Sequence, residues 1–356
     1  MNCLTSNPWT RKIAHLAVSC AMALAAPAVS WAQTAPQLEK VVVAGWSKPI
    51  TEITNLLVEE DKGFFKARGI ELGYVPGAGG GDALRNILSG QADVAFTDPG
   101  SFFTALDKGA KLRAIYDIYP QNVFNVVSLK TQNILKPADL KGKRIGVYSL
   151  SSGTRQNLQV LLNQAGLTEA DVTVVVTGLL NFAPLMQGQV DATAATDTGL
   201  LVGRQKGLGG VNVMEIKNHL NISSDFFVVR EDTYQQKKDV LKRFLHAYQD
   251  SAKWMMQSPE EAAKLAVKYA IDGQNISMNL DIIRLRNESS VSAITEQRGL
   301  GAFDMAGLQK GANAYKAFGV IQRDIRVSDV VSQDLLPPFT SANSRAQTTT
   351  RTTTKK

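Results

Sequence analysis

The 356-residue sequence is poor in the side chains that carry covalent or metal chemistry, with two cysteines and three histidines. Both cysteines, Cys3 and Cys20, lie in the first 32 residues, so the rest of the chain can form neither a disulfide nor a thiolate nucleophile. His219 and His246 lie far apart and lack the short spacing typical of metal ligands. No Gly-x-Ser-x-Gly motif is present to expose a serine nucleophile. These absences argue against thiol, metal and serine-hydrolase chemistry.

The sequence also lacks an excess of basic residues between its two ends and, after residue 32, a long apolar run. No later segment approaches the ~20 apolar residues of a membrane-spanning helix. Residues 33–344 are nearly neutral, which argues against nucleic acid as a partner. Residues 339–356 are rich in threonine and lysine and are expected to be a disordered tail. The net charge of +7 comes mainly from the two ends, through Arg11, Lys12, Arg345, Arg351, Lys355 and Lys356.

The first residues have the pattern of an export signal. Arg11 and Lys12 precede an apolar, alanine-rich stretch over 13–28, and Ser30-Trp31-Ala32 places small residues at the cleavage positions. This pattern predicts a cleaved signal peptide over residues 1–32 and a protein exported to the periplasm. A lipoprotein signal at Cys20 is the less favoured alternative, because the apolar run continues past the cysteine.

One motif occurs twice in the chain. Residues 88–98 read LSGQADVAFTD, and residues 186–197 read MQGQVDATAATD. In each copy an apolar helix end meets Gly-Gln-x-Asp, a short apolar strand follows, and Thr-Asp ends it. The glycine suits a helix C-cap, since it adopts the left-handed conformation without steric cost. Two such copies predict two similar α/β lobes, with ligand-binding edges where the strands end.

The order of the expected elements indicates how the chain divides. Lobe 1 is predicted to comprise residues 33–122 and 225–338, and lobe 2 residues 127–224. Two crossings, at 124–127 and 226–229, would form a two-strand hinge that permits closure around a ligand. Within this frame the apolar patterns predict strands at 40–45, 70–75, 94–97, 144–148, 172–177 and 192–196, and helices at 53–65, 101–108, 156–164 and 238–256, with Asp82 as the N-cap of a further helix.

Four segments resemble a known protein family. They are residues 63–70 (GFFKARGI), 88–96 (LSGQADVAF), 139–147 (DLKGKRIGV) and 185–194 (LMQGQVDATA). In order and spacing they are similar to periplasmic solute-binding proteins of ABC importers, in the nitrate, sulfonate, taurine and thiamine-precursor branch. The resemblance implies an α/β, two-lobe periplasmic-binding-protein-like fold of type II, with the ligand enclosed between the lobes. It also implies a membrane ABC permease with its ATPase as partners, and we expect a monomer.

Candidate ligand-binding residues of lobe 1 follow its predicted strands. Trp46 and Ser47 end the first strand, where Trp46 can stack on a planar or apolar ligand or pack on the lobe surface. Gly80 and Gly81 belong to a glycine turn before a helix, which suits either an anion or a plain tight turn. Asp98 ends the first copy of the repeated motif and suits an amino or hydroxyl group, unless nearby loop N–H groups occupy it.

Candidate residues of lobe 2 occupy corresponding places. Ser151, Ser152 and Thr154 lie between a strand and a helix and offer hydroxyl and N–H groups to a carboxylate or sulfonate, although such residues also cap helices without a ligand. Asp197 ends the second copy of the motif. Arg155 and Phe182 are weaker candidates, and residues 254–256 are expected to serve helix packing. The remaining candidates are Asn181, before the second-copy helix, and Asp225, beside the hinge.

We therefore expect a binding protein that captures a small polar organic solute, with no cofactor, no metal and no catalysis. The solute is expected to be a sulfonate, a carboxylate or a thiamine-pyrimidine-like compound. One alternative is an enzyme on the same fold, similar to thiamine-pyrimidine synthases, although the cysteine-dependent members of that group need thiols that residues 33–356 lack. A second alternative is a sensor subunit that binds a solute and signals to a membrane receptor.

Overall fold

The computed structural model describes residues 38–180 and 182–339. The predicted signal peptide, residues 340–356 of the predicted tail and the candidate Asn181 lie outside the described residues. Among the helices of the described ranges, none is long and apolar enough to cross a membrane.

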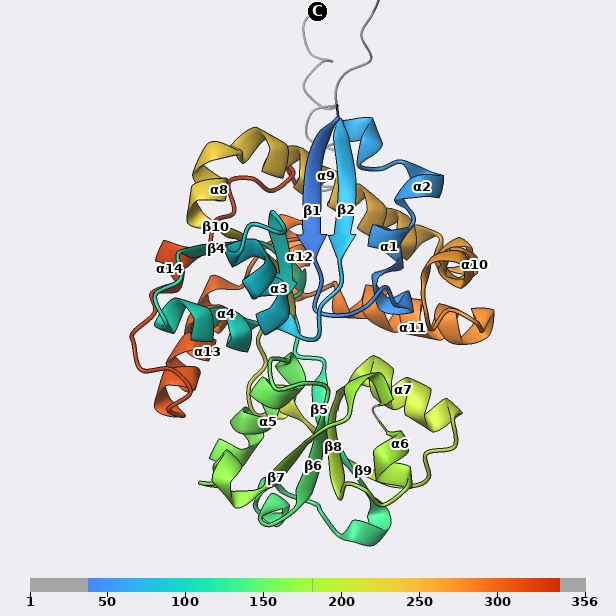
Figure 1. Cartoon of the computed structure of the whole chain (residues 1–356), viewed down its shortest axis with the longest axis vertical. Coiled ribbons are helices and arrows are strands. Elements are labelled where there is room, and N and C mark those ends of the chain that lie inside the picture. Colours follow the sequence, from blue (N-terminus) through green and yellow to red (C-terminus); the bar gives the residue numbers. More distant parts are fainter. Residues whose placement is uncertain (1–37, 181, 340–356) are drawn as a thin grey trace, which may run out of the picture. The chain divides into compact units, whose positions relative to one another are not determined.

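Two five-stranded sheets organise the chain, and we name the parts around them lobe 1 and lobe 2 (Figure 1). The lobe 1 sheet has the order β2-β1-β3-β10-β4, and the lobe 2 sheet has the order β7-β6-β8-β5-β9. The lobe 1 strands are β1 (Glu39–Ala44), β2 (Ile70–Val75), β3 (Val94–Thr97), β4 (Leu112–Tyr119) and β10 (Asp225–Arg230). The lobe 2 strands are β5 (Phe124–Leu129), β6 (Arg144–Val147), β7 (Thr173–Val176), β8 (Ala192–Thr196) and β9 (Val211–Glu215).

The two sheets have the same pairing pattern. In lobe 1, β1 lies parallel to β2 and β3, whereas β10 lies antiparallel to β3 and β4. In lobe 2, β6 lies parallel to β7 and β8, whereas β5 lies antiparallel to β8 and β9. The prediction of two similar α/β lobes from the repeated motif is confirmed.

Helices cover both faces of the lobe 1 sheet. Phe226 and Val228 of β10 belong to an apolar cluster with α3 (Gly80–Leu88) and α4 (Pro99–Asp107), while Phe227 and Val229 pack with α9 (Lys238–Gln257). Successive strand residues thus enter opposite cores, as expected for a strand buried on both faces. The other lobe 1 elements are η1 (Thr51–Ile53), α1 (Thr54–Leu57), α2 (Glu59–Lys62), η2 (Lys66–Arg68), α8 (Glu231–Gln236), α10 (Pro259–Tyr269), α11 (Ile276–Ser289), α12 (Ala293–Arg298), α13 (Met305–Ala317) and α14 (Val327–Val330).

The lobe 2 sheet is covered in the same way. Val126 and Ala194 lie in the cluster that contains α5 (Gly153–Gln164), while Val127 and Ala195 lie in a second cluster with residues of α6 (Ala183–Met186) and α7 (Asp197–Gln205). The remaining lobe 2 elements are η3 (Lys130–Gln132), η4 (Pro137–Leu140), η5 (Glu169–Asp171), η6 (Gly178–Leu180) and η7 (Ile216–Asn218).

The chain passes between the sheets twice, at residues 120–123 and at residues 216–224. The two passages are hydrogen-bonded to each other, since the hydroxyl of Ser224 accepts from the N–H of Val123 at 2.9 Å and donates to the carbonyl of Gln121 at 2.6 Å. The segments expected to cross, 124–127 and 226–229, lie inside β5 and β10. The apolar side chains of these two segments pack in the sheets, whereas the residues just before them, 120–123 and 216–224, connect the lobes.

Two local expectations are wrong. The helix expected over 53–65 is broken at Val58 into α1 and α2, and the Glu59 carboxylate then accepts the N–H groups of Phe65 and Lys66. The N-cap of α3 is Gly79, and Asp82 lies three residues later, where it accepts the N–H of Ala78 at 2.8 Å. An acidic residue at that third position reaches back over the helix start, as in a capping box.

Candidate functional site

A cavity of about 170 Å³ lies between the two lobes, where the strands β1, β3, β6 and β8 end. Four helices begin at its wall, namely α3, α4, α5 and α7, because each follows a strand end by a short turn. Ligands bind at such strand ends in open α/β sheets, where helix starts present free N–H groups. The position of the cavity is therefore a direct consequence of the two matching sheets.

Two glycines allow the chain to come close at this wall. A Cβ on Gly80 would lie 2.2 Å from Oδ2 of Asp98, and a Cβ on Gly153 would lie 2.6 Å from the ring of Phe124. Real Cβ atoms do not approach other atoms so closely, so a larger residue at either position would push a wall residue aside. Both glycines line the cavity.

Asp98 is a buried carboxylate at the cavity wall. It is the N-cap of α4 and accepts the N–H of Ser101 at 2.8 Å and the hydroxyl of Ser101 at 2.7 Å. Burial raises the pKa of Asp98 to about 6, although these hydrogen bonds lower it. Its prediction as a strand-end residue of the site is consistent with its place at the cavity.

Asp225 is the second buried carboxylate of the cavity and lies at the start of β10. It is 7 % exposed, and within the described residues its side chain accepts no hydrogen bond. Burial raises the pKa of Asp225 well above its ordinary value, and the nearby Asp98 raises it further, while Arg286 lowers it. A buried carboxylate without a donor is costly, which makes Asp225 the most unusual group of the cavity.

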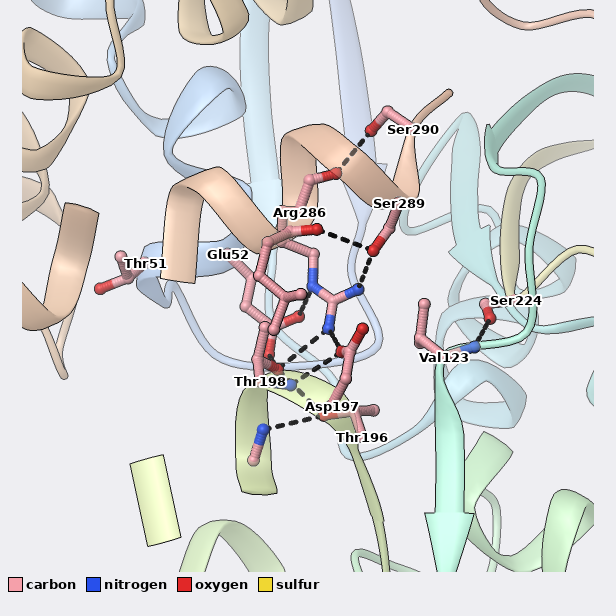
Figure 2. Close-up of polar contacts among 12 residues, drawn as sticks. Thr51, Glu52, Val123, Thr196, Asp197, Thr198, Ser224, Arg286, Ser289 and Ser290 are labelled. Atoms are coloured by element: carbon pink, nitrogen blue, oxygen red, sulfur yellow. Dashed lines mark hydrogen bonds and ion pairs between the residues drawn. The ribbon is translucent and has the colours of Figure 1, made fainter. Parts of the chain in front are cut away.

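Arg286 of α11 contributes a buried guanidinium and joins the two lobes (Figure 2). It forms ion pairs with Glu52 of lobe 1, at 2.9 Å, and with Asp197 of lobe 2. Its guanidinium also donates to the hydroxyl of Thr198 at 3.1 Å, and that hydroxyl donates to Glu52. Burial raises the pKa of Glu52, whereas Arg286 lowers it. The charge of Arg286 is thus compensated by protein carboxylates.

Aromatic rings from both lobes complete the wall. Trp46 of lobe 1 and Tyr148 of lobe 2 meet edge to face, with centroids 6.4 Å apart and ring planes at 89°. Tyr119 also lines the cavity and has the guanidinium of Arg286 over its ring, at 5.2 Å from the centroid. The wall therefore offers both ring faces and charged groups to a ligand.

The serine and threonine candidates of lobe 2 bond mainly to one another. The hydroxyls of Ser152 and Thr154 lie 2.7 Å apart, Ser152 donates to the carbonyl of Ser149, and Thr154 accepts the N–H of Tyr148. Both residues line the cavity. Ser151 does not line it, because its hydroxyl is turned to the carbonyl of Ala78 in lobe 1, at 3.1 Å. These side chains stabilise the turn, so they have little hydrogen-bonding capacity left for a ligand.

The structure brings six of the eleven predicted site residues together around the cavity: Trp46, Gly80, Asp98, Ser152, Thr154 and Asp225. Ser47 is fully buried and bonds to the carbonyl of Lys48. The N–H of Gly81 bonds to the carbonyl of Ser151 at the seam between the lobes. Asp197 binds Arg286 behind the wall. The roles of all these residues in ligand binding stay predictions.

The weaker candidates lie elsewhere. Arg155 pairs with Glu169, Phe182 is in the apolar core of lobe 2, and Trp254 packs on Phe64. Sequence reasoning missed Glu52, Tyr119, Tyr148 and Arg286. For Arg286 a signal existed in the sequence, since it follows Ile282 and Ile283 by four and three residues and so shares their helix face, which the structure buries.

No group of three or more His, Cys, Asp or Glu residues is arranged to hold a metal ion within the described ranges. His219 and His246 are not among the residues that line the cavity. Lys206 does line it and is exposed, so it lies toward solvent.

The two matched sheets with a cavity between them define a periplasmic-binding-protein-like fold. The chain belongs to the family described as NMT1/THI5 like, which matches residues 50–262, more than half of its length. The fold is shared with the alkanesulfonate-binding protein SsuA of Xanthomonas axonopodis pv. citri, solved bound to MOPS. The TM-score is 0.65 and the identity 16 %, over 84 % of this chain and all of the other.

Two relatives differ in what their names say they do. The riboflavin-binding protein RibY of Chloroflexus aurantiacus is 22 % identical over 88 % of this chain and 91 % of its own length. The 4-amino-5-hydroxymethyl-2-methylpyrimidine phosphate synthase of Schizosaccharomyces pombe is also 22 % identical, over 59 % of this chain and 63 % of its own length. Similarity at this level is therefore compatible with both binding and catalysis.

Proposed function

We propose that this protein is the periplasmic substrate-binding component of an ABC importer, which captures a small organic solute and delivers it to a membrane permease with its ATPase. The observation that carries the proposal is the cavity between the lobes, lined from both sheets by aromatic and carboxylate side chains. A site divided between two lobes is accessible when the lobes part and is enclosed when they meet, which suits capture and release.

Contacts across the seam support closure by rigid lobes. On one side, Gly81 donates to the carbonyl of Ser151 at 3.0 Å. On the other side, Thr198 donates to Glu52. These bonds join residues of different lobes, so they break when the lobes part and form again when they close. A permease that recognises the closed arrangement would distinguish loaded from empty protein.

Export supports the same role. The signal pattern over residues 1–32 and the fold both fit a protein that works in the periplasm. N-terminal sequencing of exported protein tests this part, with a start near Gln33 as the expected result. A lipid-modified Cys20 at the start of the chain would contradict it.

The function itself is tested with the mature chain and a thermal-shift screen of sulfonates, carboxylates, amines, pyrimidines and riboflavin. A ligand at a hundred times its Kd adds about 2.7 kcal/mol of stability. Small-angle scattering should then show a smaller radius of gyration with the ligand bound. Mass spectrometry of the ligand after incubation should recover it unchanged. Tight binding with an unchanged radius, or conversion of the ligand, would contradict the proposal.

A synthase-like enzyme is the second candidate, because one relative is named as a synthase and Lys206 reaches the cavity. An aldehyde cofactor such as pyridoxal phosphate would need a lysine of this kind. Incubation with pyridoxal phosphate, borohydride reduction and peptide mapping distinguish the candidates. Specific modification of Lys206, absent in Lys206→Arg, would favour the enzyme, whereas diffuse labelling of surface lysines would favour the binding protein.

A further inference from the structure

The cavity contains an acidic side chain that has no hydrogen-bond partner in the part of the chain that the structure describes. Asp225 is 7 % exposed, lines the cavity and accepts no side-chain hydrogen bond within the described residues. Asp98, 2 % exposed, lines the same cavity, and its bonds come from Ser101 of its own helix. Buried polar groups in proteins are almost always hydrogen-bonded, and the carboxyl oxygens of Asp225 are open to the cavity, so a ligand can supply the donor that they lack.

We propose that the ligand enters with a cationic nitrogen group, which donates hydrogen bonds to Asp225 beside Asp98 and lies against the rings of Trp46, Tyr119 and Tyr148. The inference rests on the proposed function, because it specifies the chemical class that the same cavity accepts. It also departs from the expectation that a sulfonate or carboxylate end is held by the serine and threonine turn.

The balance of buried charge favours a cation. Among the described residues, the buried carboxyl groups of Asp98 and Asp225 and the partly buried one of Glu52 line the cavity, against the one buried guanidinium of Arg286. Arg286 is already paired with Glu52 and with Asp197, so it is not free to receive an anion. The other two charged lining residues in the described ranges, Lys206 and Asp272, are exposed and carry opposite charges. An anionic end would thus face carboxyl groups and no unpaired guanidinium.

The aromatic wall favours the same class. Trp46 and Tyr148 come from different lobes and meet at 89°, so they form a corner that closes only when the lobes meet. Ring faces attract cations, and desolvation in a closed cavity strengthens that attraction. Tyr119 already accepts one cation, since Arg286 lies over its ring. A corner of rings next to two carboxylates suits an ammonium group, an amidinium group or a protonated amino-heterocycle.

A matched series of small probes tests the inference by calorimetric titration of the mature protein. Benzylamine and benzamidine carry the cation, 4-aminopyrimidine carries a weakly basic ring with an amino group, benzyl alcohol is neutral, and phenylmethanesulfonate is anionic. We expect the cations to bind about tenfold to a hundredfold tighter than the alcohol, as fits a hydrogen bond to a charged group. The sulfonate should bind most weakly. Comparison of benzylamine with 4-aminopyrimidine shows whether the cavity prefers an alkylammonium group or an amino-substituted ring.

Variants assign the effect to a residue. Asp225→Asn should abolish the preference for benzylamine over benzyl alcohol, and Asp98→Asn should reduce it. Asp329→Asn, an exposed carboxylate of α14, is the matched control and should leave the preference unchanged. Melting curves establish that each variant folds, and Asp225→Ser replaces Asp225→Asn if the latter does not.

The outcomes separate this inference from the proposed function. Tighter binding of the sulfonate than of the amines, or a preference for amines that survives Asp225→Asn, overturns the inference and leaves a binding protein of another specificity. Failure of every probe, and of every compound in the wider screen, overturns both.

Discussion

The two copies of the repeated motif share Gly-Gln-x-Asp and differ by one residue in the length of the strand that follows. Gly90 and Gly188 each follow a helix and adopt positive φ, at 78° and 70°. Asp93 and Asp191 each exchange hydrogen bonds with the neighbouring parallel strand, Asp93 with Val42 and Asp191 with Arg144. In each pair the carboxylate accepts a backbone N–H of that strand, at 3.0 and 2.8 Å. The shared residues thus fix the register of each lobe.

The final aspartates have different surroundings. Asp98 is the N-cap of α4 and lies in the cavity wall. In the second copy Thr196 is the N-cap, so Asp197 is the first residue of α7 and binds Arg286 instead. The second copy has one more residue between its Gly-Gln-x-Asp and its Thr-Asp, so Thr196 takes the N-cap place that Asp98 has in the first copy. Asp197 then lies one residue further on and forms an ion pair between the lobes. One extra residue in a strand is thus enough to give the Thr-Asp pair a different role in each lobe.

The largest expected effect on stability comes from removing Arg286, which pairs with Asp197 of the second copy. Arg286→Met leaves the buried carboxyl of Glu52 without its cation, and breaking a buried pair in this way costs about 3–5 kcal/mol. Denaturant unfolding should show this loss, with partial recovery when Glu52→Gln is added. Arg284→Met, on the same helix but exposed, should change stability by less than about 0.5 kcal/mol. A small effect of Arg286→Met would show that the ion pairs do not hold the lobes.

The next largest effect is the contribution of Asp98, in the first copy, to the pH dependence of stability. Its folded-state pKa is about 6, against an ordinary value of 3.8, so the folded protein binds more protons than the unfolded chain between these values. Its contribution to stability therefore falls as pH rises from about 4 to about 6 and then stays constant, a loss of roughly 3 kcal/mol at most. Asp98→Asn keeps an N-cap and should remove this contribution.

The measurement is the free energy of unfolding of wild type and Asp98→Asn across pH 4 to 8. The two should agree near pH 4, and the variant should be the more stable above pH 6. Because the buried Asp225 and Asp117 also have raised pKa values, the difference between the two proteins is what reports on Asp98, together with the effect of its charge on Asp225. A difference that does not vary with pH would contradict the raised pKa.

The aspartates that the copies share should behave alike. Asp93→Ala and Asp191→Ala each remove a carboxylate that accepts a strand N–H, with an expected cost of about 1.5 kcal/mol in either case. Asp→Asn at the same positions keeps an acceptor and should cost less. Urea unfolding of all four variants measures this. A large difference between the copies would show that the motif has a register role in one lobe only.

The smallest expected effect is at the shared glycines. Gly90→Ala and Gly188→Ala force a side chain into the left-handed conformation, at about 1 kcal/mol each. The environment of Gly188 is open, so the cost there is conformational rather than steric. Gly209→Ala, at an open position without positive φ, is the control and should be neutral. Thermal melts of the three variants rank them.

Local patterns carried most of the fold. The strands at 70–75, 94–97 and 192–196 have the predicted bounds, because short apolar runs between glycine turns have few alternatives. The helix at 53–65 was wrong because the chain breaks at Val58 and because Gly63, in the left-handed conformation, ends α2 at Lys62. The crossings were misplaced because the sequence does not distinguish an apolar strand that starts beside a hinge from the hinge segment itself.

The sequence alone determined the duplication of the lobe and the identity of its strand-end residues, since both follow from periodicity, glycine positions and a motif read twice. Tertiary structure alone decided which strand-end groups meet. Tyr148 joins Trp46, and Arg286 joins Glu52 and Asp197, across distances in sequence that no local pattern records. It also decided that Asp225 has no hydrogen-bond donor among residues 38–180 and 182–339, because burial and the positions of neighbours, rather than residue type, set whether a carboxylate is hydrogen-bonded.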